Sequence, residues 1–551
     1  MARRYAFREF VSTANLCALV VPLAWLFLFT PYGMDTTDFG YFYGYAWRIL
    51  EGQTPYRDFA YIKPALPLYW HALWLWLTPE KYAILGGKAG FLVSILLSSW
   101  LCSLYLARYF CFKSLKLPLP LLATCGFIFG VHSFPHMPWH TADGILFSTL
   151  ALWLSASHPF LSGLSAACAM ACKQSFLPVP IVIVILLCAN HSRRDAILFA
   201  AGLALALGSF CFWLLGTNAW DNFIKMTTGQ LDWREALDAG LLIYLRQNWL
   251  LPLVALAPWL AGRIFSKKMA DLWQPCILYM LLLCACYIWQ VETGKSWIGF
   301  GFSWPTLFMC LGALAMLFSR AMLAPIYNWP QVPHAAWKAA CSLGASLVAA
   351  WCVAISGGYK IPAMLAVPSL FSFFIAQKWL GGNVASLAWL TLFCGMSMFA
   401  TGYQYPYVFP ERPLARSEQV YDAGEIYQAA TGVKVDADML ARLAELKALR
   451  QKYGPRYKTM PGFTMAYFLN KDQTVYGSDW LIDWEINGET ERFYKDLLDS
   501  DLVVFMEKDQ LDAKQADAYS RAAYTVPQLV RNNWRIIEET PHFVVFKAPT
   551  K

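Results

Sequence analysis

The chain has 551 residues, of which 58% are hydrophobic and 15% are charged, with a mean hydropathy of +0.40 and a formal net charge of +8. A soluble globular protein is about 45–50% apolar and about 25% charged, so the composition excludes an ordinary soluble enzyme. Repeated apolar runs of about 20 residues predict transmembrane helices. Because the positive excess belongs to the membrane part, it does not indicate binding to nucleic acid.

Thirteen apolar segments are candidate membrane spans. They lie near 11–30, 84–107, 118–132, 141–157, 160–175, 178–190, 196–215, 241–261, 273–290, 303–319, 338–356, 361–377 and 384–400. Arg3, Arg4 and Arg8 precede the first span, and positive residues favour the cytoplasmic side. Thirteen crossings then place the chain after residue 400 outside the cytoplasm. We therefore expect a multi-pass membrane protein whose C-terminal region lies outside the cytoplasm.

The first outer loop, residues 31–83, carries an unusual density of charged and aromatic residues. Polar groups at a bilayer are costly and are often functional. The stretch from Asp38 to Gly52, DFGYFYGYAWRILEG, places Tyr41, Tyr45 and Ile49 at helical spacing, which predicts an amphipathic helix on the outer membrane interface. Asp38 falls in its first turn, where the helix dipole stabilises a carboxylate. Alternatively, Asp38 is a helix cap and Lys63 is an interfacial anchor.

The last 151 residues differ from the rest in composition. They contain no cysteine and most of the 36 acidic residues. A Pro- and Tyr-rich connector after Thr401 leads to a helix predicted over Ala437–Tyr453. Strand-like runs follow at Phe463–Leu469, Asp501–Phe505 and Trp534–Lys547, the last broken at Thr540-Pro541. We therefore predict two domains, a transmembrane catalytic domain over 1–400 and a small soluble α/β domain over 401–551.

Metal sites and disulfides are not indicated by the cysteines and histidines. All 15 cysteines precede residue 395, and no pair has metal-binding spacing. His132, His136 and His140 recur every four residues, but Pro135 and Pro138 would break a helix there, which favours hydrogen bonding in a loop. We predict no metal ligand and no certain cofactor, with a requirement for a divalent cation left open. No P-loop, GxGxxG or GxSxG motif is present.

The first loop resembles that of GT-C glycosyltransferases, in particular bacterial members similar to aminoarabinose transferase and protein O-mannosyltransferases. The shared pattern is an acid after the first helix, an Ala-x-x-x-Leu helix ending in Gly, then Lys-Pro and an aromatic re-entry. The family usually reads Asp-Glu and Lys-Pro-Pro, whereas here Phe39 follows Asp38 and Ala65 follows Lys63-Pro64. Asp35, one turn earlier, could replace the missing second carboxylate.

Three further motifs are similar to later parts of the same family. HTADGILFSTLALWL resembles its fourth helix and places Asp143 at the outer face. GLSAACAMACKQSFLP resembles its short fifth helix and places Lys173 at the end. TGKSWIGFGFSWP is similar to a later outer loop and places Lys295 before a Pro-marked helix. The resemblance thus extends over most of the chain and implies a polytopic α-helical membrane protein of GT-C type.

The resemblance implies a transferase that moves a sugar from a polyprenyl-phosphate donor to a hydroxyl acceptor, which could be a glycan, a lipid or a protein. Asp38 would act as general base, with Asp143 or Asp35 in support, and inversion at the anomeric carbon is expected. Lys63, with Lys173 or Lys295, would bind the lipid phosphate. Further candidates for substrate binding are Tyr41, Arg57, Asp58 and His140.

Two other functions share lipid-linked substrates with such an enzyme. A transporter or flippase would predict internal repeats and polar residues at the bilayer midplane, and neither is evident in the sequence. A polymerase or ligase of lipid-linked glycans would also use outer loops, but it would not require the first-loop motif. Membrane lipids surround the protein in every case.

Overall fold

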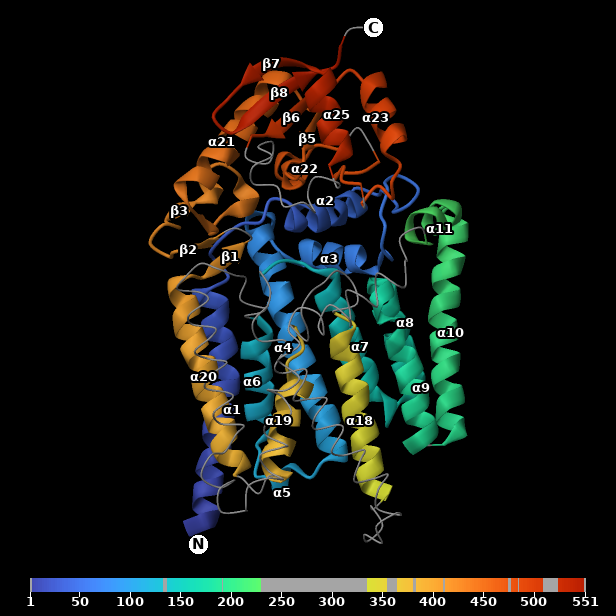
Figure 1. Ribbon diagram of the computed structural model, residues 1–551, viewed down its shortest axis with the longest axis vertical. Coiled ribbons are helices and arrows are strands. Elements are labelled where there is room, and N and C mark those ends of the chain that lie inside the picture. Colours follow the sequence, from blue (N-terminus) through green and yellow to red (C-terminus); the bar gives the residue numbers. More distant parts are fainter. Residues whose placement is uncertain are drawn as a thin grey trace, which may run out of the picture.

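The structure is a computed structural model, and it describes residues 2–131, 136–190, 192–228, 334–353, 364–379, 383–409, 412–473, 477–483, 485–508 and 524–549. Upright helices form a bundle, and the C-terminal region covers one end of it (Figure 1). The N-terminus lies at the opposite end of the bundle. The predicted spans 241–261, 273–290 and 303–319 lie outside the described residues.

Each of the other predicted spans overlaps a helix of the bundle. These helices are α1 (Ala2–Leu28), α4 (Ala83–Tyr109), α6 (Leu119–Val131), α7 (His140–Ser155), α8 (Pro159–Cys172), α9 (Pro178–Asn190), α10 (Arg193–Gly216), α18 (His334–Trp351), α19 (Val367–Trp379) and α20 (Val384–Gln404). Within the described residues, three stretches are long and apolar enough to cross a membrane alone: Glu80–Tyr109, Arg193–Gly216 and Val384–Gln404. The helix-rich fold is confirmed, and the number of thirteen crossings stays a prediction.

Small residues bring two bundle helices together. A Cβ atom at Gly163 of α8 would lie 2.1 Å from the carbonyl oxygen of Phe199 in α10, and one at Gly202 would lie 2.1 Å from that of Phe160. Glycine at both positions lets the backbones touch, as in apolar helix pairs that lack a hydrophobic driving force. Helix α10 begins with a capping box between Ser192 and Asp195. Gly163 and Gly202 therefore allow the short distance between α8 and α10.

Two shorter helices lie across the end of the bundle, beneath the C-terminal region (Figure 1). They are α2 (Asp38–Leu50) and α3 (Leu66–Leu77), and the 3-10 turn η1 (Glu80–Tyr82) leads from α3 into α4. The prediction that α2 is a half-exposed interfacial helix is wrong, because every residue from Phe39 to Arg48 is buried. Helix α22 (Met465–Asn470) packs on the face that was expected to meet water.

Short elements connect the bundle helices or flank them. They are α5 (Phe112–Leu115), η2 (Gln174–Phe176) and α11 (Trp220–Thr228). The side-chain amide of Asn222 in α11 donates to the carbonyl oxygen of Tyr56 over 2.8 Å, and that of Asn487 in the C-terminal region donates to the carbonyl oxygen of Lys225 over 2.8 Å. Helix α11 thus ties the first loop to the C-terminal region.

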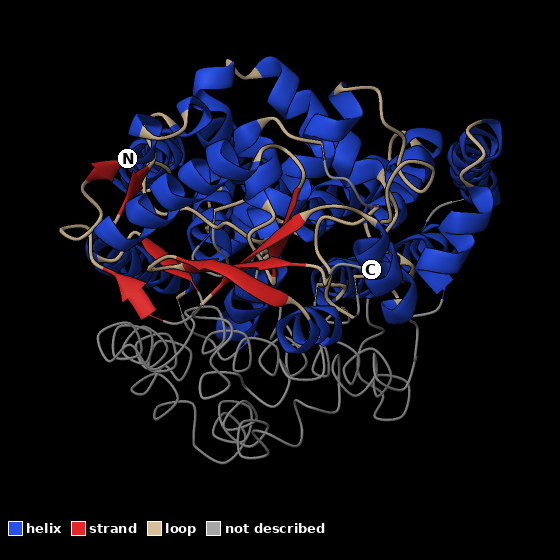
Figure 2. Ribbon diagram, turned by 90° about the horizontal axis from the view of Figure 1, so that it is seen from above, coloured by secondary structure: helices blue, strands red, loops and turns tan. Residues whose placement is uncertain are grey.

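The C-terminal region has a four-stranded sheet in the order β5-β6-β8-β7. Strands β5 (Tyr457–Met460) and β6 (Val503–Glu507) are parallel, and β7 (Arg535–Glu539) and β8 (Phe543–Lys547) form an antiparallel pair with β8 next to β6. Seen from above, the strands cross over the end of the bundle (Figure 2). The remaining elements are β1 (Tyr407–Phe409), β2 (Arg412–Leu414), β3 (Tyr421–Asp422), η5 (Ala423–Glu425), η6 (Gln428–Ala430), β4 (Lys434–Val435), α21 (Ala437–Tyr453), α23 (Thr490–Asp499) and α25 (Thr525–Asn533).

The predicted elements of this region are mostly confirmed. Helix α21 has the predicted bounds, and the runs at 501–505 and 534–547 form β6 and the β7–β8 pair. The strand predicted over Phe463–Leu469 is wrong, since this segment forms α22. Its residues Met465, Ala466 and Leu469 are good helix formers, and a short apolar run does not distinguish strand from helix by periodicity. One hydrophobic core continues from the bundle into the C-terminal region.

Candidate active site

The start of α2 is fixed by Asp35. Its Oδ1 accepts hydrogen bonds from the backbone N–H groups of Thr37 and Phe39, each over 2.9 Å. Burial raises the pKa of Asp35 to about 6, although the hydrogen bonds from these N–H groups lower it. Asp35, which was not predicted as a cap, therefore accepts hydrogen bonds from the N–H groups at the start of α2, and the alternative reading of Asp38 as the helix cap is not supported.

Asp38 stands in the first turn of α2. Its carboxylate has no hydrogen-bond partner among the described residues, and burial raises its pKa well above the ordinary value. The neighbouring carboxylates of Asp35 and Glu485 raise this pKa further, whereas Lys63 and Lys173 lower it. A carboxylate that is unpaired and has a raised pKa is a stronger base than an exposed one. The geometry suits proton abstraction by Asp38.

Lys63 meets a partner from the C-terminal region. Its Nζ lies 2.7 Å from Glu485 Oε1, and the hydroxyl of Tyr41 donates to Glu485 Oε2 over 2.7 Å. Glu485 is 5% exposed, and the Lys63 side chain is 15% exposed. The predicted residues Lys63 and Tyr41 are thus brought together by an acid that lies more than 400 residues later in the chain.

Lys173 follows the last residue of α8, as the family motif predicts. It is buried, and its Nζ lies 3.4 Å from the hydroxyl of Thr141. The next residue, Gln174, donates from Nε2 to the carbonyl oxygen of Ile62 over 3.1 Å, beside Lys63. This bond holds the two lysine-bearing segments against each other, so both ammonium groups act on Asp38.

An apolar groove of about 320 Å³ is lined in part by residues that are close in sequence to these lysines. Ala65 and Leu66 of its wall follow Lys63 closely, and Cys168 and Ala171 precede Lys173. The other lining residues come from α3, α8 and α10: Tyr69, Ala167, Ala206, Leu207, Phe210 and Trp213. The apolar wall of this groove suits a hydrocarbon chain.

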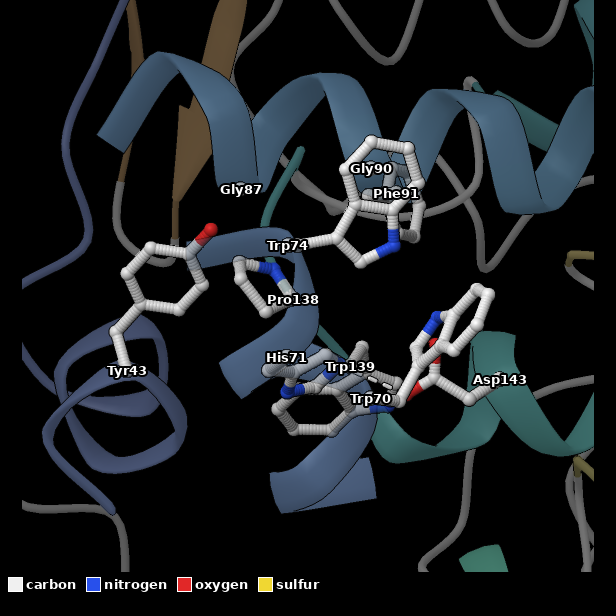
Figure 3. A pocket seen from close by; sticks show the side chains of 10 residues that line it. All are labelled: Tyr43, Trp70, His71, Trp74, Gly87, Gly90, Phe91, Pro138, Trp139 and Asp143. Carbon is white, nitrogen blue, oxygen red and sulfur yellow. Dashed lines mark ion pairs between the residues drawn. The ribbon is translucent and has the colours of Figure 1, made fainter. Parts of the chain in front are cut away.

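Asp143 opens α7 and forms a second buried pair. Its Oδ2 lies 2.8 Å from Nε2 of His71 in α3, and both side chains are 4% exposed. The pair borders a cavity of about 10 Å³, room for roughly one water molecule. Figure 3 shows the pair from close by, with Trp74 and Tyr43 on other walls of the cavity. Asp143 therefore fixes α3, which begins just after Lys63, and it is not a cap of α7, whose N-cap is Trp139.

His140 lies beside this pair, in the same helix as Asp143. It is 2% exposed, and its ring lies 5.1 Å from that of Phe42 and 4.8 Å from that of Trp139, measured between centroids. Neither ring nitrogen has a hydrogen-bond partner among the described residues. Its position next to the lysines agrees with the candidate role in substrate binding, which stays a prediction.

Arg57 and Asp58 are not brought to the Asp38 cluster. Arg57 Nη2 lies 2.7 Å from Asp58 Oδ2 at the surface, where the side chains are 46% and 30% exposed. Lys295 lies outside the described residues. Within the part of the chain that the structure describes, no group of three His, Cys, Asp or Glu residues is arranged to hold a metal ion.

Sequence reasoning missed three residues of the site: Glu485, His71 and Gln174. Glu485 stands between Ile482 and Ile486 in a soluble-looking region, and an acid among apolar residues was the available signal. His71 was hidden within an aromatic run, LPLYWHALWLWL. Gln174 is adjacent to a predicted lysine. Each is recognised by its tertiary partner, which a single sequence does not give.

Comparisons with known proteins give a likeness in structure. The sequence matches no protein-family model and no curated protein. The crystal structure of ArnT from Cupriavidus metallidurans in the apo state is similar with a TM-score of 0.46 and 11% identity, covering 99% of this chain and 100% of that chain. The crystal structure of the same protein bound to undecaprenyl phosphate gives a TM-score of 0.47 and 12% identity, covering 98% and 99%. Both likenesses span nearly the whole chain.

Proposed function

We propose that this protein is a membrane glycosyltransferase that moves a sugar from a polyprenyl phosphate to a hydroxyl acceptor. The observation that carries the proposal is the convergence of Asp38, Lys63 and Lys173, whose two lysines are close in sequence to residues that line the apolar groove. The lysines suit the phosphate as point charges, and the groove suits the start of the isoprenoid chain. A nearby unpaired carboxylate then stands where the reacting sugar would be held.

The proposed reaction is a displacement at the anomeric carbon. The acceptor oxygen forms a bond to this carbon while the bond from the carbon to the phosphate oxygen breaks, and its electron pair stays on the phosphate. Lys63 and Lys173 stabilise the charge that develops on this leaving group. Asp38 takes the proton of the acceptor hydroxyl, a contribution typically of about 10²–10⁴ in rate. Attack from the face opposite the phosphate inverts the anomeric centre.

The position of the site favours an enzyme that works at the outer face of the inner membrane. The cluster lies at the bundle end that carries the C-terminal region, opposite the basic N-terminus (Figure 1). Positive residues favour the cytoplasm, so this end is assigned to the periplasm of a bacterial inner membrane. A transporter would place its polar site near the midplane instead. The acceptor, whether glycan, lipid or protein, would enter from the side of the C-terminal region.

The experiment compares Asp38→Asn and Lys63→Ala with Asp58→Asn, a matched control whose carboxylate is at the surface. Each variant is expressed in a strain deleted for the gene, and surface glycans, lipids and proteins are analysed by mass spectrometry. Binding of undecaprenyl phosphate to the purified proteins is measured in parallel.

Asp38→Asn should abolish the modification and leave binding nearly intact, whereas Lys63→Ala should weaken binding and Lys63→Arg should retain part of it. Asp58→Asn should behave as wild type in both measurements. Normal modification in the Asp38→Asn strain would contradict the assignment of the base. Unchanged binding in Lys63→Ala would contradict the phosphate site.

A further inference from the structure

The carboxylate of Glu485 occupies a position built to receive an anion. One of its oxygens faces the ammonium group of Lys63 and the other faces the hydroxyl of Tyr41, each over 2.7 Å. Two converging donors from the first loop thus bind two oxygens of one acidic group. A phosphate presents its oxygens in a similar way, with comparable hydrogen-bond lengths to charged donors.

Both donors are held in place by contacts that do not involve Glu485. The ring of Tyr41 packs against those of Tyr45 and Tyr61, with centroids 4.7 and 5.9 Å away. The backbone of Lys63 is fixed because its carbonyl oxygen accepts a hydrogen bond from the hydroxyl of Tyr56 over 2.5 Å. The bond from Gln174 to the carbonyl oxygen of Ile62 secures the preceding residue. Tyr41 and Lys63 would therefore keep their positions if Glu485 moved away.

Formal charges favour an exchange of anions over the addition of one. The charges of Lys63 and Glu485 are opposite and lie 2.7 Å apart, so this pair sums to zero. A phosphodiester bound beside an unmoved Glu485 would leave an uncompensated negative charge in a largely buried site, which is strongly unfavourable. If the phosphate replaces the carboxylate, the balance is kept, and Glu485 gains water as it leaves.

We propose that Lys63 and Tyr41 form the binding site for the donor phosphate and that Glu485 fills this site in the free protein until the phosphate displaces it. The inference rests on the proposed function and adds Tyr41 as a phosphate ligand and Glu485 as an internal competitor. Such a competitor multiplies the apparent affinity for the donor by the fraction of molecules in which the site is free of Glu485. The ion pair between Arg48 of α2 and Asp479 of the C-terminal region does not involve Glu485. It would therefore hold the C-terminal region on α2 when Glu485 is released.

The test measures binding of undecaprenyl phosphate to the full-length protein in detergent micelles. Glu485→Gln keeps the shape of the side chain, but a neutral hydrogen bond has roughly half the strength of a charged one. This variant should bind the lipid about five- to tenfold more tightly than wild type, and Glu485→Ala should also bind more tightly. Glu491→Gln, which removes the same charge from an exposed position of α23, should leave the affinity unchanged.

The outcomes separate this inference from the proposed function. If Glu485→Gln weakens binding as Lys63→Ala does, Glu485 only positions Lys63, and the inference is wrong while the function stands. If wild type does not bind the lipid and Lys63→Ala changes nothing, both fail. Inorganic phosphate is titrated as a second arm, and millimolar phosphate should compete weakly. Equal affinity for inorganic phosphate and the lipid would make the ligand a soluble phosphate and overturn the donor assignment.

Discussion

A buried ion pair joins α2 to the C-terminal region, and its removal should destabilise the protein strongly. Arg48 Nη1 lies 2.8 Å from Asp479 Oδ1, with side chains that are 3% and 0% exposed. The guanidinium also lies 4.6 Å from the ring centroid of Phe59. Lys458 is a second buried cation in the field of Asp479, and burial lowers its pKa to about 7. Asp479→Asn therefore withdraws the counter-charge from two buried groups.

The expected loss in the free energy of unfolding is about 3–5 kcal/mol, the usual effect of removing one partner of a buried pair. Asp58→Asn, which breaks the exposed pair with Arg57, should change it by about 1 kcal/mol or less. Thermal unfolding in detergent, followed by tryptophan fluorescence, compares the two variants under one condition. Lys458 can respond by losing its proton, whereas Arg48 stays charged.

A double variant tests the cause of this loss. Arg48→Met combined with Asp479→Leu removes both charges, and replacing a buried pair by apolar residues is often neutral. It should therefore unfold at a higher temperature than Asp479→Asn. Equal unfolding temperatures for Asp479→Asn and Asp58→Asn would refute the reasoning, and so would a double variant that is no more stable than Asp479→Asn.

Two further predictions concern the pH dependence and the close contact of α2 with α22. Burial and the carboxylates of Asp35 and Glu485 raise the pKa of Asp38. The kcat for sugar transfer should therefore increase with pH, with its midpoint above the ordinary aspartate pKa of about 4. A midpoint near pH 4 would contradict this. Stability should change with pH in the opposite direction. Asp35 has a pKa of about 6 in the folded protein, so the folded state binds this proton more tightly, and the unfolding temperature should rise as pH falls from about 6 to about 4. The Asp35→Asn variant should lack this contribution. A Cβ atom at Gly40 would lie 2.1 Å from the backbone nitrogen of Met465, so Gly40→Ala should detach α22 and speed limited proteolysis after residue 400, whereas Gly208→Ala, with no atom within 4 Å, should not.

The sequence was most informative where the physical signal is local. Apolar length located the bundle helices, and the helical spacing of apolar residues over Ala437–Tyr453 gave α21 its bounds. The strand-like runs in the last 151 residues predicted a region with a sheet. Asp38, Lys63 and Lys173 were reached through short motifs, and the structure brings these three together. The roles assigned to them stay predictions.

The sequence was misleading where a distant segment decides the environment. The stripe of tyrosines in α2 has the pattern of an interfacial helix, yet Tyr41 packs against Trp480 of the C-terminal region. On the other face of α2, α22 lies close to Gly40, and the carbonyl oxygen of Thr36 accepts a hydrogen bond from the N–H of Met465 over 2.9 Å. Arg57 and Asp58 pair with each other at the surface, and their candidate role in substrate binding stays a prediction. Glu485 could not be placed, because its partners lie in the first loop.

The same desolvation that strengthens Asp38 as a base makes pairing necessary for the charges around it. Lys63 is matched by Glu485 and Arg48 by Asp479, and unpaired charges at these depths would destabilise the fold. Both acids come from the C-terminal region, which therefore supplies the counter-charges that the buried helix α2 and its neighbours require. Besides burial, the carboxylates of Asp35 in the first loop and Glu485 in the C-terminal region raise the pKa of Asp38. The raised pKa of Asp38 thus depends on both regions of the chain.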